Sequence, residues 1–309
     1  MRSPPGGRRR RVAFVGQETY FRICSLSRPT RSLEPLFVDY RAGADAELML
    51  DTVTRFRADV VIVFRPETVP PGLFAGLDAL TVGWSTEPLP RGRRNVHPDL
   101  SWRLSELALV DRTSFDRVVT FDPLSAAAAE AHVPVWRSVP LPVDDTVYSP
   151  PRPLAGPPRV VFVGYSTEHR ERWLVEAKHR FDIVHAAHGV HGNRLLELFG
   201  RTDVAINLHG EPYPTFENRV SLHLAAGHLV LSEPLSPLQG LEPGLDFLEV
   251  RSPKQLELAI AGLHEHPRTF SRIQVRGRLK AERFRASRVY PRLVADLAAD
   301  VAAFGSERR

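Results

Sequence analysis

Short runs of Val, Ile, Leu and Phe alternate with segments of helical periodicity along most of the chain. In the first half the runs lie at 11–16, 35–40, 59–64, 79–84 and 117–121, and almost every position in them is apolar. Runs of this kind are typical of strands that are buried on both faces of a sheet. The pattern therefore predicts five buried strands in the first half.

The segments between these runs have the period of an α-helix. Residues 44–56 place Met49, Val53 and Phe56 on one helical face, and the Ala-rich segment 122–132 begins at Asp122, a suitable N-cap. Strands that alternate with helices form parallel, doubly wound sheets. We therefore predict an α/β fold.

The pattern stops and starts again near the middle of the chain. Residues 149–158 contain five prolines, which neither a helix nor a sheet interior accepts. The segment that follows, "RVVFVGYST" at 159–167, repeats most of "RVAFVGQET" at 11–19. Further strands are predicted at 182–186, 203–207, 229–232 and 246–250, and the chain ends in helical segments at 269–286 and 290–304. The repeated pattern predicts two Rossmann-like domains whose parallel sheets face an interdomain cleft. Clefts between domains are where ligands bind.

Length and composition agree with a two-domain globular protein. The chain has 309 residues, of which 43% are hydrophobic and 25% are charged. Cys24 is the only cysteine, which excludes an intrachain disulfide and a cysteine-based zinc site. No apolar run approaches the roughly 20 residues that span a bilayer, and the first apolar run is too short for a signal peptide. We expect a cytoplasmic protein.

The net charge of +5 does not indicate a nucleic-acid-binding surface. Residues 1–11 contain five arginines and no acidic residue, so the rest of the chain sums to zero. We predict that residues 1–10 are a disordered basic end, for which weak contact with a membrane surface is the remaining functional option. The cluster "RGRR" at 91–94 stands alone, so no specific nucleic-acid partner is expected.

The first candidate site lies at the start of the second half. Gly164 ends a predicted strand and precedes a predicted helix, so its backbone can approach a phosphate at the helix N-terminus. Arg170 and Arg172 follow, and guanidinium groups suit a diphosphate. The alternative is an ordinary tight turn followed by a solvated helix face.

The second candidate site is the segment "PTFENRVSLHLAAGHLVLSEP" at 214–234. Thr215 can cap a helix that begins at Phe216, and Gly227 can end it. Arg219 and His223 lie one turn apart on one face. This polar face, which also holds Glu217 and Asn218, would lie at the carboxyl side of the sheet, where doubly wound folds bind ligands. The alternative is a helix whose polar side chains face water.

These motifs resemble those of a known family. "LPVDDTVYSP" at 141–150 looks like the connector between the domains of GT-B-fold glycosyltransferases. "NRVSLHLAAGHLVLSE", "GLEPGLDFLEVRSPKQLELAI" and "RIQVRGRLKAERF" follow one another as in the carboxyl half of the CgeB-like, spore-maturation-type glycosyltransferases. The resemblance covers roughly residues 80–290 and is strongest over 203–285.

The resemblance implies the roles of the two halves. It implies an acceptor domain at 11–148, a linker at 149–158, a nucleotide-sugar domain at 159–288 and a helix at 289–309, for which a return to the first domain is left open. The implied donor-side residues are Gly164, Arg170, Arg172 and Arg219 at the diphosphate, His188 and Gly189 near the base, Asn207, His209 and Glu217 at the sugar or ribose, and Asn218 and His223 beside them. The implied acceptor-side residues are Gly16, Glu87 and Asp122.

One departure leaves the catalytic assignment open. Related retaining enzymes have two carboxylates eight residues apart on this helix, and the corresponding positions here are Pro214 and Leu222. Glu217 or Glu233 would have to replace them. An inverting reaction would instead need a general base in the first domain, for which Glu87 and Asp122 are candidates by position.

Metal independence is expected. The chain contains no Asp-x-Asp motif, so arginines and helix N-termini would neutralise the leaving diphosphate, with Arg219 as the main catalytic candidate. His185, His188 and His191 lie three apart, but they straddle a strand and a glycine loop and should diverge. No metal and no cofactor other than the donor are predicted.

The leading prediction is a glycosyltransferase that moves a sugar from a UDP-, GDP- or TDP-type donor to an unidentified glycan, lipid-linked or small-molecule acceptor. The alternative within enzymes is a sugar-nucleotide epimerase, which needs no acceptor. The alternative from another class is a non-catalytic protein that binds sugar nucleotides or glycans, motivated by the missing pair of carboxylates.

Overall fold

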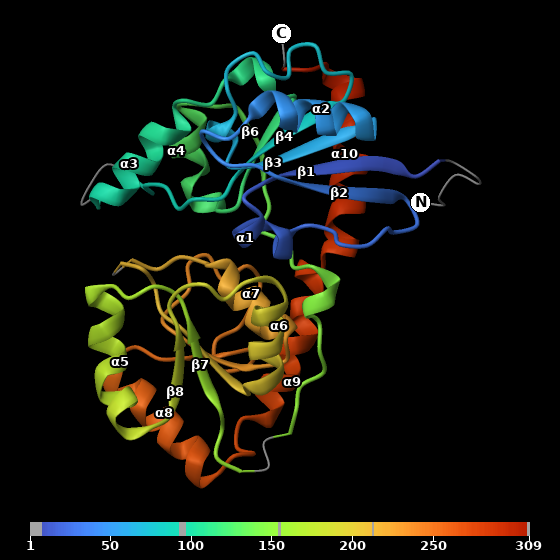
Figure 1. The fold of residues 1–309 in the computed structure, drawn as a ribbon. Helices are drawn as coiled ribbons and strands as arrows, with labels where there is room; N and C mark the ends of the chain where they lie inside the picture. The colour runs from blue at the N-terminus through green and yellow to red at the C-terminus, as the bar shows by residue number, and fades with distance from the viewer. Residues whose placement is uncertain (1–7, 93–96, 154–155, 212, 308–309) are drawn as a thin grey trace. The chain divides into compact units, whose positions relative to one another are not determined.

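The structure is a computed structural model that describes residues 8–92, 97–153, 156–211 and 213–307. The chain folds into two compact units, coloured along the chain in Figure 1. Unit 1 consists of Met1–Asp145 and Ala286–Arg309, and unit 2 consists of Thr146–Arg285.

Unit 1 contains a parallel six-stranded sheet with the strand order β2-β1-β3-β4-β5-β6. The five strands predicted in this half are confirmed, with ends shifted by one or two residues. The sixth, β6, was missed because its four residues are only half-buried and include an arginine. The strands are β1 (Arg10–Gly16), β2 (Leu33–Asp39), β3 (Val60–Phe64), β4 (Leu80–Ser85), β5 (Arg117–Thr120) and β6 (Val135–Ser138).

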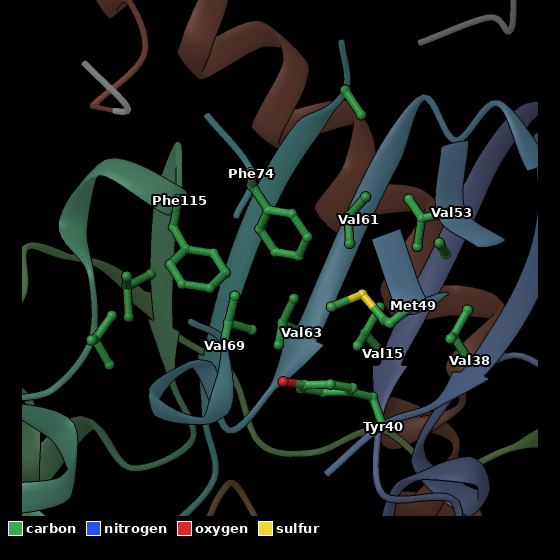
Figure 2. Packing of buried hydrophobic residues seen from close by; sticks show 14 of the residues in the cluster. Val15, Val38, Tyr40, Met49, Val53, Val61, Val63, Val69, Phe74 and Phe115 are labelled. Atoms are coloured by element: carbon green, nitrogen blue, oxygen red, sulfur yellow. The ribbon is translucent and has the colours of Figure 1, made fainter. Parts of the chain in front are cut away.

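Alternate side chains of this sheet enter two separate cores, because successive residues of a strand point to opposite faces. On one face, Val15 and Val63 pack with Met49 and Val53 from α2, as Figure 2 shows. This confirms the helix predicted over 44–56, of which Phe56 is only partly buried. The helices of the first 145 residues are α1 (Glu18–Phe21), α2 (Ala46–Phe56), α3 (Pro98–Leu107) and α4 (Ala126–Glu130).

The other face of this sheet is covered by α10 (Ala286–Phe304), drawn in red in Figure 1. Tyr290 of α10 is fully buried, and its ring meets Phe14 edge-on at a centroid distance of 4.6 Å. Trp84 packs against the same ring, and the Tyr290 hydroxyl donates to the carbonyl of Cys24. The end of the chain therefore completes the core of unit 1.

Unit 2 contains a parallel five-stranded sheet with the order β11-β10-β9-β7-β8, and every strand lies where the sequence predicts one. Helices α5 and α8 pack on the same face of it. The strands are β7 (Val160–Val163), β8 (Ile183–Ala186), β9 (Val204–Asn207), β10 (Leu229–Ser232) and β11 (Leu248–Glu249). The helices are α5 (Glu168–Arg180), α6 (Gly192–Arg201), α7 (Asn218–Ala225), α8 (Pro253–Glu265) and α9 (Ser271–Lys280).

Both sheets are doubly wound, as predicted. In unit 1 the chain leaves β1 for β2 on one side and then crosses to β3 on the other side. In unit 2 it leaves β7 for β8 and then crosses to β9. Ligands of open α/β sheets bind outside the carboxyl ends of the strands at such a switch point. The two candidate places are therefore the ends of β1 and β3 and the ends of β7 and β9.

Several local predictions were wrong or fall outside the described residues. The helix predicted from Phe216 begins at Asn218, and the hydroxyl of Thr215 contacts His209 in place of capping it. The final helix begins at Ala286, because its first residues already pack in the core of unit 1. Most of the basic end and parts of the 91–94 cluster and the 149–158 segment lie outside the described residues.

Candidate functional site

The polar side chains of unit 2 gather at its switch point, where β7, β9 and the neighbouring β10 end. Gly164 follows β7, Asn207 is the last residue of β9, and Glu233 follows β10. Two arginines enter this place from helices. Arg170 lies in the first turn of α5, and Arg219 lies in the first turn of α7.

Gly164 leaves the space that Arg219 occupies, and Arg170 lies in contact beside it. Its φ is +154°, and a Cβ built on it would lie 2.5 Å from Nη1 of Arg219 and 3.4 Å from Nη1 of Arg170. Both guanidinium groups also lie over the ring of Phe162, at 5.6 Å for Arg170 and 5.5 Å for Arg219. We call Arg170 and Arg219 the guanidinium pair. The glycine that was predicted to admit a phosphate thus admits the groups that would bind one.

Arg219 is held by the ends of two strands. Its Nε donates to Oδ1 of Asn207 at 3.1 Å, and Asn207 is itself fully buried and bound to Ser232. Its Nη1 donates to the carbonyl of Val163 at 2.7 Å and its Nη2 to the carbonyl of Leu208 at 3.0 Å. The charged group is therefore fixed at the ends of β7 and β9.

Arg170 is more deeply buried, with a relative exposure of 3%. Burial lowers the pKa of its guanidinium, and the positive charge of Arg219 lowers it further. The ring of Tyr165 covers it at 4.9 Å, and this ring is about half exposed. The Arg170 guanidinium donates to the main-chain carbonyls of Tyr165, Leu208 and His209.

Glu217 is the carboxylate that faces the guanidinium pair. It contacts Nη2 of Arg219 directly, and Nη2 of Arg170 lies 3.6 Å from its Oε2. Burial alone would raise the pKa of Glu217. Arg219, His209 and Arg170 outweigh that effect and lower the pKa to about 2. Glu217 is therefore ionised at neutral pH.

His209, His169 and Glu233 form a second layer around the pair. Nε2 of His209 donates to the carbonyl of Pro234 at 2.9 Å, and its Nδ1 lies 3.3 Å from the Thr215 hydroxyl and 3.6 Å from Oε1 of Glu217. Glu233 is 5% exposed and accepts from the main-chain N–H of His209 at 2.7 Å. Its other oxygen lies 2.8 Å from Nε2 of His169. The sequence analysis missed His169, although its place in the first turn of α5 beside Arg170 was a usable signal.

His185 supports the glycine turn from the neighbouring strand. Nζ of Lys178 donates to its Nδ1 at 2.9 Å, so its Nε2 carries the proton that is donated to the carbonyl of Gly164 at 2.8 Å. Lys178 is held in turn by Glu171. His185 therefore positions the turn, which the sequence analysis considered only as part of a metal site.

Three other predicted donor-side residues lie away from the guanidinium pair. Arg172 is on the exposed face of α5 and pairs with Glu168 across one helical turn. His188 and Gly189 are exposed in the loop after β8, at the same edge of the sheet. The solvated-face interpretation therefore describes Arg172. Asn218 is the first residue of α7 and is partly buried beside the pair.

His223 is not brought to the site either. It is fully buried, and its Nδ1 lies 3.0 Å from Nδ1 of His228. Nε2 of His228 donates to the carbonyl of Phe199, so its Nδ1 accepts from His223. Burial lowers the pKa of His228 to about 4 and lowers the pKa of His223 well below its ordinary value. The two imidazoles are neutral core residues.

The acceptor-side residues lie at the carboxyl edge of the unit 1 sheet. Glu87 faces Arg103 at 3.4 Å. Asp122 caps a short 3-10 helix through the N–H of Leu124, which confirms the cap, and it also pairs with Arg91. At Gly16, a Cβ would meet the side chains of Phe21 and Phe64. The absence of a side chain at Gly16 is therefore explained by packing.

The sequence analysis missed Glu67, which follows β3 beside the unit 1 switch point. Its side chain is 7% exposed, and its Oε1 accepts from Nε of Arg65 at 2.8 Å. Burial raises the pKa of Glu67, the neighbouring Glu87 raises it further, and Arg65 opposes both. A buried carboxyl group with a raised pKa suits proton transfer. The segment "RPET" carries no motif by which the sequence would show this.

Within the described ranges, no group of three or more His, Cys, Asp and Glu residues is arranged to hold a metal ion. No helix in the part of the chain that the structure describes is long and apolar enough to cross a membrane.

The chain resembles solved glycosyltransferase structures over nearly its whole length. Sucrose-phosphate synthase from Thermosynechococcus elongatus superposes with a TM-score of 0.64 at 12% identity, covering 94% of this chain and 100% of that one. Anabaena HepE in complex with UDP-glucose superposes with a TM-score of 0.61 at 11% identity, covering 94% and 99%. The chain has the GT-B fold.

Other comparisons mark how far this similarity extends. A candidate UDP-N-acetylglucosamine 2-epimerase from Listeria monocytogenes also superposes, with a TM-score of 0.52 at 9% identity, covering 97% of this chain and 98% of that one. No protein-family model and no curated protein sequence matches the chain. The GT-B resemblance is therefore confirmed as a fold, and the narrower CgeB-like resemblance stays a prediction.

Proposed function

We propose that the chain is a glycosyltransferase that takes a sugar from a nucleoside diphosphate donor bound in unit 2. The observation that carries this proposal is the guanidinium pair, the buried Arg170 and the partly buried Arg219, at Gly164 and the switch point of the unit 2 sheet. Two guanidinium groups held at the carboxyl ends of parallel strands suit a diphosphate. UDP-glucose bound to the structurally similar HepE supports this type of ligand.

The proposed chemistry follows from the charge of the pair. As the bond between the anomeric carbon and the diphosphate breaks, negative charge grows on the leaving oxygen, and fixed cations near it stabilise the transition state. Arg219 is the proposed catalytic residue for this step, and Arg170 assists it. Glu217 is the proposed contact for a ribose or sugar hydroxyl, whereas Asn207 and His209, predicted for the same task, are buried and bound within the protein and so position their neighbours. Because the two arginines supply the positive charge, we propose turnover without a divalent metal.

The acceptor is proposed to bind to unit 1. For an inverting reaction a carboxylate must take the proton of the acceptor hydroxyl, and Glu87 and Glu67 are the candidates after β4 and β3. Asp122 is less suited, because both of its carboxylate oxygens are engaged by Leu124 and Arg91. In a retaining reaction the leaving diphosphate would take the proton of the acceptor hydroxyl instead.

Titration calorimetry with UDP, GDP and TDP, each with and without Mg²⁺, tests the donor site. We expect one of them to bind without metal and Arg219→Ala to weaken that binding by 100-fold or more, because a charge-assisted pair with phosphate is lost. Arg219→Lys should recover only part of it, because a lysine lacks the planar fork. Arg172→Ala is the matched control on the exposed face of α5 and should change nothing.

Product analysis then separates the enzyme classes. Transfer of the sugar to an added acceptor supports the proposal. Conversion of the donor sugar without an acceptor would favour the epimerase, with which the chain also shares its fold. Binding without turnover on any acceptor tried would favour a non-catalytic sugar-nucleotide-binding protein. Activity that appears only after Mn²⁺ or Mg²⁺ is added would contradict the metal-independent mechanism.

A further inference from the structure

We propose that Glu217 positions the guanidinium pair by occupying the place of the donor's diphosphate, so that a ligand must displace this carboxylate in order to bind. This inference rests on the proposed function, because it concerns the same site. This role of Glu217 is additional to a contact with the sugar or the ribose.

The partners of the guanidinium pair show why Glu217 is the group that can leave. Arg219 donates to two main-chain carbonyls and to the buried Asn207, and Arg170 donates to three main-chain carbonyls. Carbonyls at strand ends cannot move away without distortion of the sheet. Among the described residues, Glu217 is the remaining ion-pair partner of both arginines, and it is a side chain that can turn on its own torsions.

Exposure points to the same carboxylate. The side chains of Arg170 and Arg219 are 4% and 12% exposed, whereas that of Glu217 is 26% exposed. The carboxylate therefore lies on the solvent side of the pair, where an incoming anion would arrive. The second carboxylate nearby, Glu233, is 7% exposed at its side chain and is engaged by His169 and the N–H of His209.

The difference in negative charge between Glu217 and a diphosphate favours replacement of the carboxylate by the ligand. Glu217 offers one negative charge to two guanidinium groups, whereas a diphosphate ester offers at least two together with more acceptor oxygens. The lowered pKa of Glu217 supports the inference, because the competing carboxylate keeps its full charge throughout the pH range of an assay. The displaced carboxylate is then free to contact a hydroxyl of the bound donor.

A neutral side chain of the same shape tests the exchange. Glu217→Gln should raise the affinity for inorganic pyrophosphate and for UDP about tenfold, because the ligand no longer competes with a fixed anion. Without ligand the variant should melt at a lower temperature than the wild type, since two buried guanidinium groups lose their carboxylate. Ordinary damage to a binding site would lower both the affinity and the melting temperature.

Titration calorimetry of the full chain with pyrophosphate and with UDP is the measurement, and Glu168→Gln is the control, since Glu168 pairs with the exposed Arg172. Glu217→Asp is measured in parallel. Aspartate keeps the charge but has a shorter side chain, so the gain in affinity should be smaller than for Glu217→Gln. This variant also tests the inference if Glu217→Gln does not fold. A gain for both ligands in Glu217→Gln supports the inference.

The contrary results are distinguishable. Unchanged or weakened pyrophosphate binding in the folded variants would overturn the role of Glu217, and wild-type binding of UDP would still support the proposed function. If the wild type and all variants bind neither UDP nor pyrophosphate, the inference and the proposed diphosphate site fail together.

Discussion

At the scale of single residues, the site depends on the lack of a side chain at Gly164. Nη1 of Arg219 fills the space that a Cβ would take. The sequence pointed to this glycine as a place for phosphate, but the nearest atom is in a guanidinium group of the protein. In the absence of a ligand, the guanidinium groups of the site are therefore in contact with groups of the protein itself.

Gly164→Ala should disturb both stability and binding. Its Cβ would meet Nη1 of Arg219 at 2.5 Å, and its φ of +154° disfavours a side chain. We expect a loss of about 1–3 kcal/mol in the free energy of unfolding and a loss of diphosphate affinity, because Arg219 must move. Chemical denaturation and calorimetry measure the two effects. Gly189→Ala is the control, since its φ is +71° but nothing lies within 4 Å of the new Cβ. Equal effects at both glycines would show that collision with Arg219 is unimportant.

Arg170 and Arg172 lie on different faces of α5 although they are only two positions apart. Arg170 shares a face of α5 with the buried Trp173, Leu174 and Ala177, which lie three, four and seven positions after it. Arg172 is off that face and exposed. The helical period of the sequence therefore distinguishes the buried Arg170 from the exposed Arg172.

At the scale of elements, the join between α7 and β10 was the least predictable part. Arg219 and His223 are one turn apart on α7, which suggested one shared polar face. The long side chain of Arg219 reaches from the first turn of the helix to the end of β7, whereas the shorter His223 packs inward against His228 and Phe199. Leu222, where related enzymes carry a carboxylate, is buried as well.

The histidine pair should make stability depend on pH. The pKa of His228 is lowered, by burial first, to about 4 from an ordinary value of about 6.5, so the unfolded chain binds more protons between these values. Stability is therefore full above about pH 6.5 and is lost as the pH falls toward 4. From pH 7 to pH 5, His228 alone should account for about 2 kcal/mol. Urea denaturation at several pH values measures this loss.

A double variant isolates the pair from the other titrating groups. His223→Leu with His228→Leu removes both imidazoles without leaving one unpartnered, and its stability should be nearly flat between pH 7 and pH 5. His188→Leu, at an exposed position, should keep the wild-type slope. A double variant with the unchanged slope would place the pH dependence elsewhere.

At the scale of the whole molecule, unit 1 is built from two distant parts of the chain and unit 2 from one. Helix α10 returns at Ala286 to cover a face of the unit 1 sheet. Its buried face includes Tyr290, Leu293, Val294 and Leu297. Unit 2 needs none of these residues for its own core.

Tyr290→Ala should therefore destabilise unit 1 alone. The side chain is fully buried among aromatic rings, and its removal should cost about 3–5 kcal/mol. In differential scanning calorimetry we expect two transitions, because separate domains need not unfold together. The transition that UDP does not shift should fall in temperature, and the one that UDP shifts should stay. Phe304→Ala, at an 80% exposed position, is the control. An equal fall of both transitions would contradict independent cores.

The sequence alone determined the described strands other than β6, the two parallel sheets and a few helix limits. Each of these depends on neighbours within a few positions: an apolar run long enough to be buried on both faces, Asp122 before a first turn, Gly227 after a last one. It also placed Gly164, Arg219 and Asn207 at strand or helix ends on one edge of a sheet. Such placement follows from topology, because the carboxyl ends of parallel strands share one edge.

Only the tertiary structure decided which of those side chains meet. Arg170, Arg219 and Glu217 converge because β7 lies next to β9, although these strands are more than forty residues apart in the sequence. Glu67 acquires its raised pKa from burial, and His223 its neutrality from His228 and the surrounding core. These contacts and pKa shifts arise between segments that are far apart in the chain, so no local pattern in the sequence encodes them.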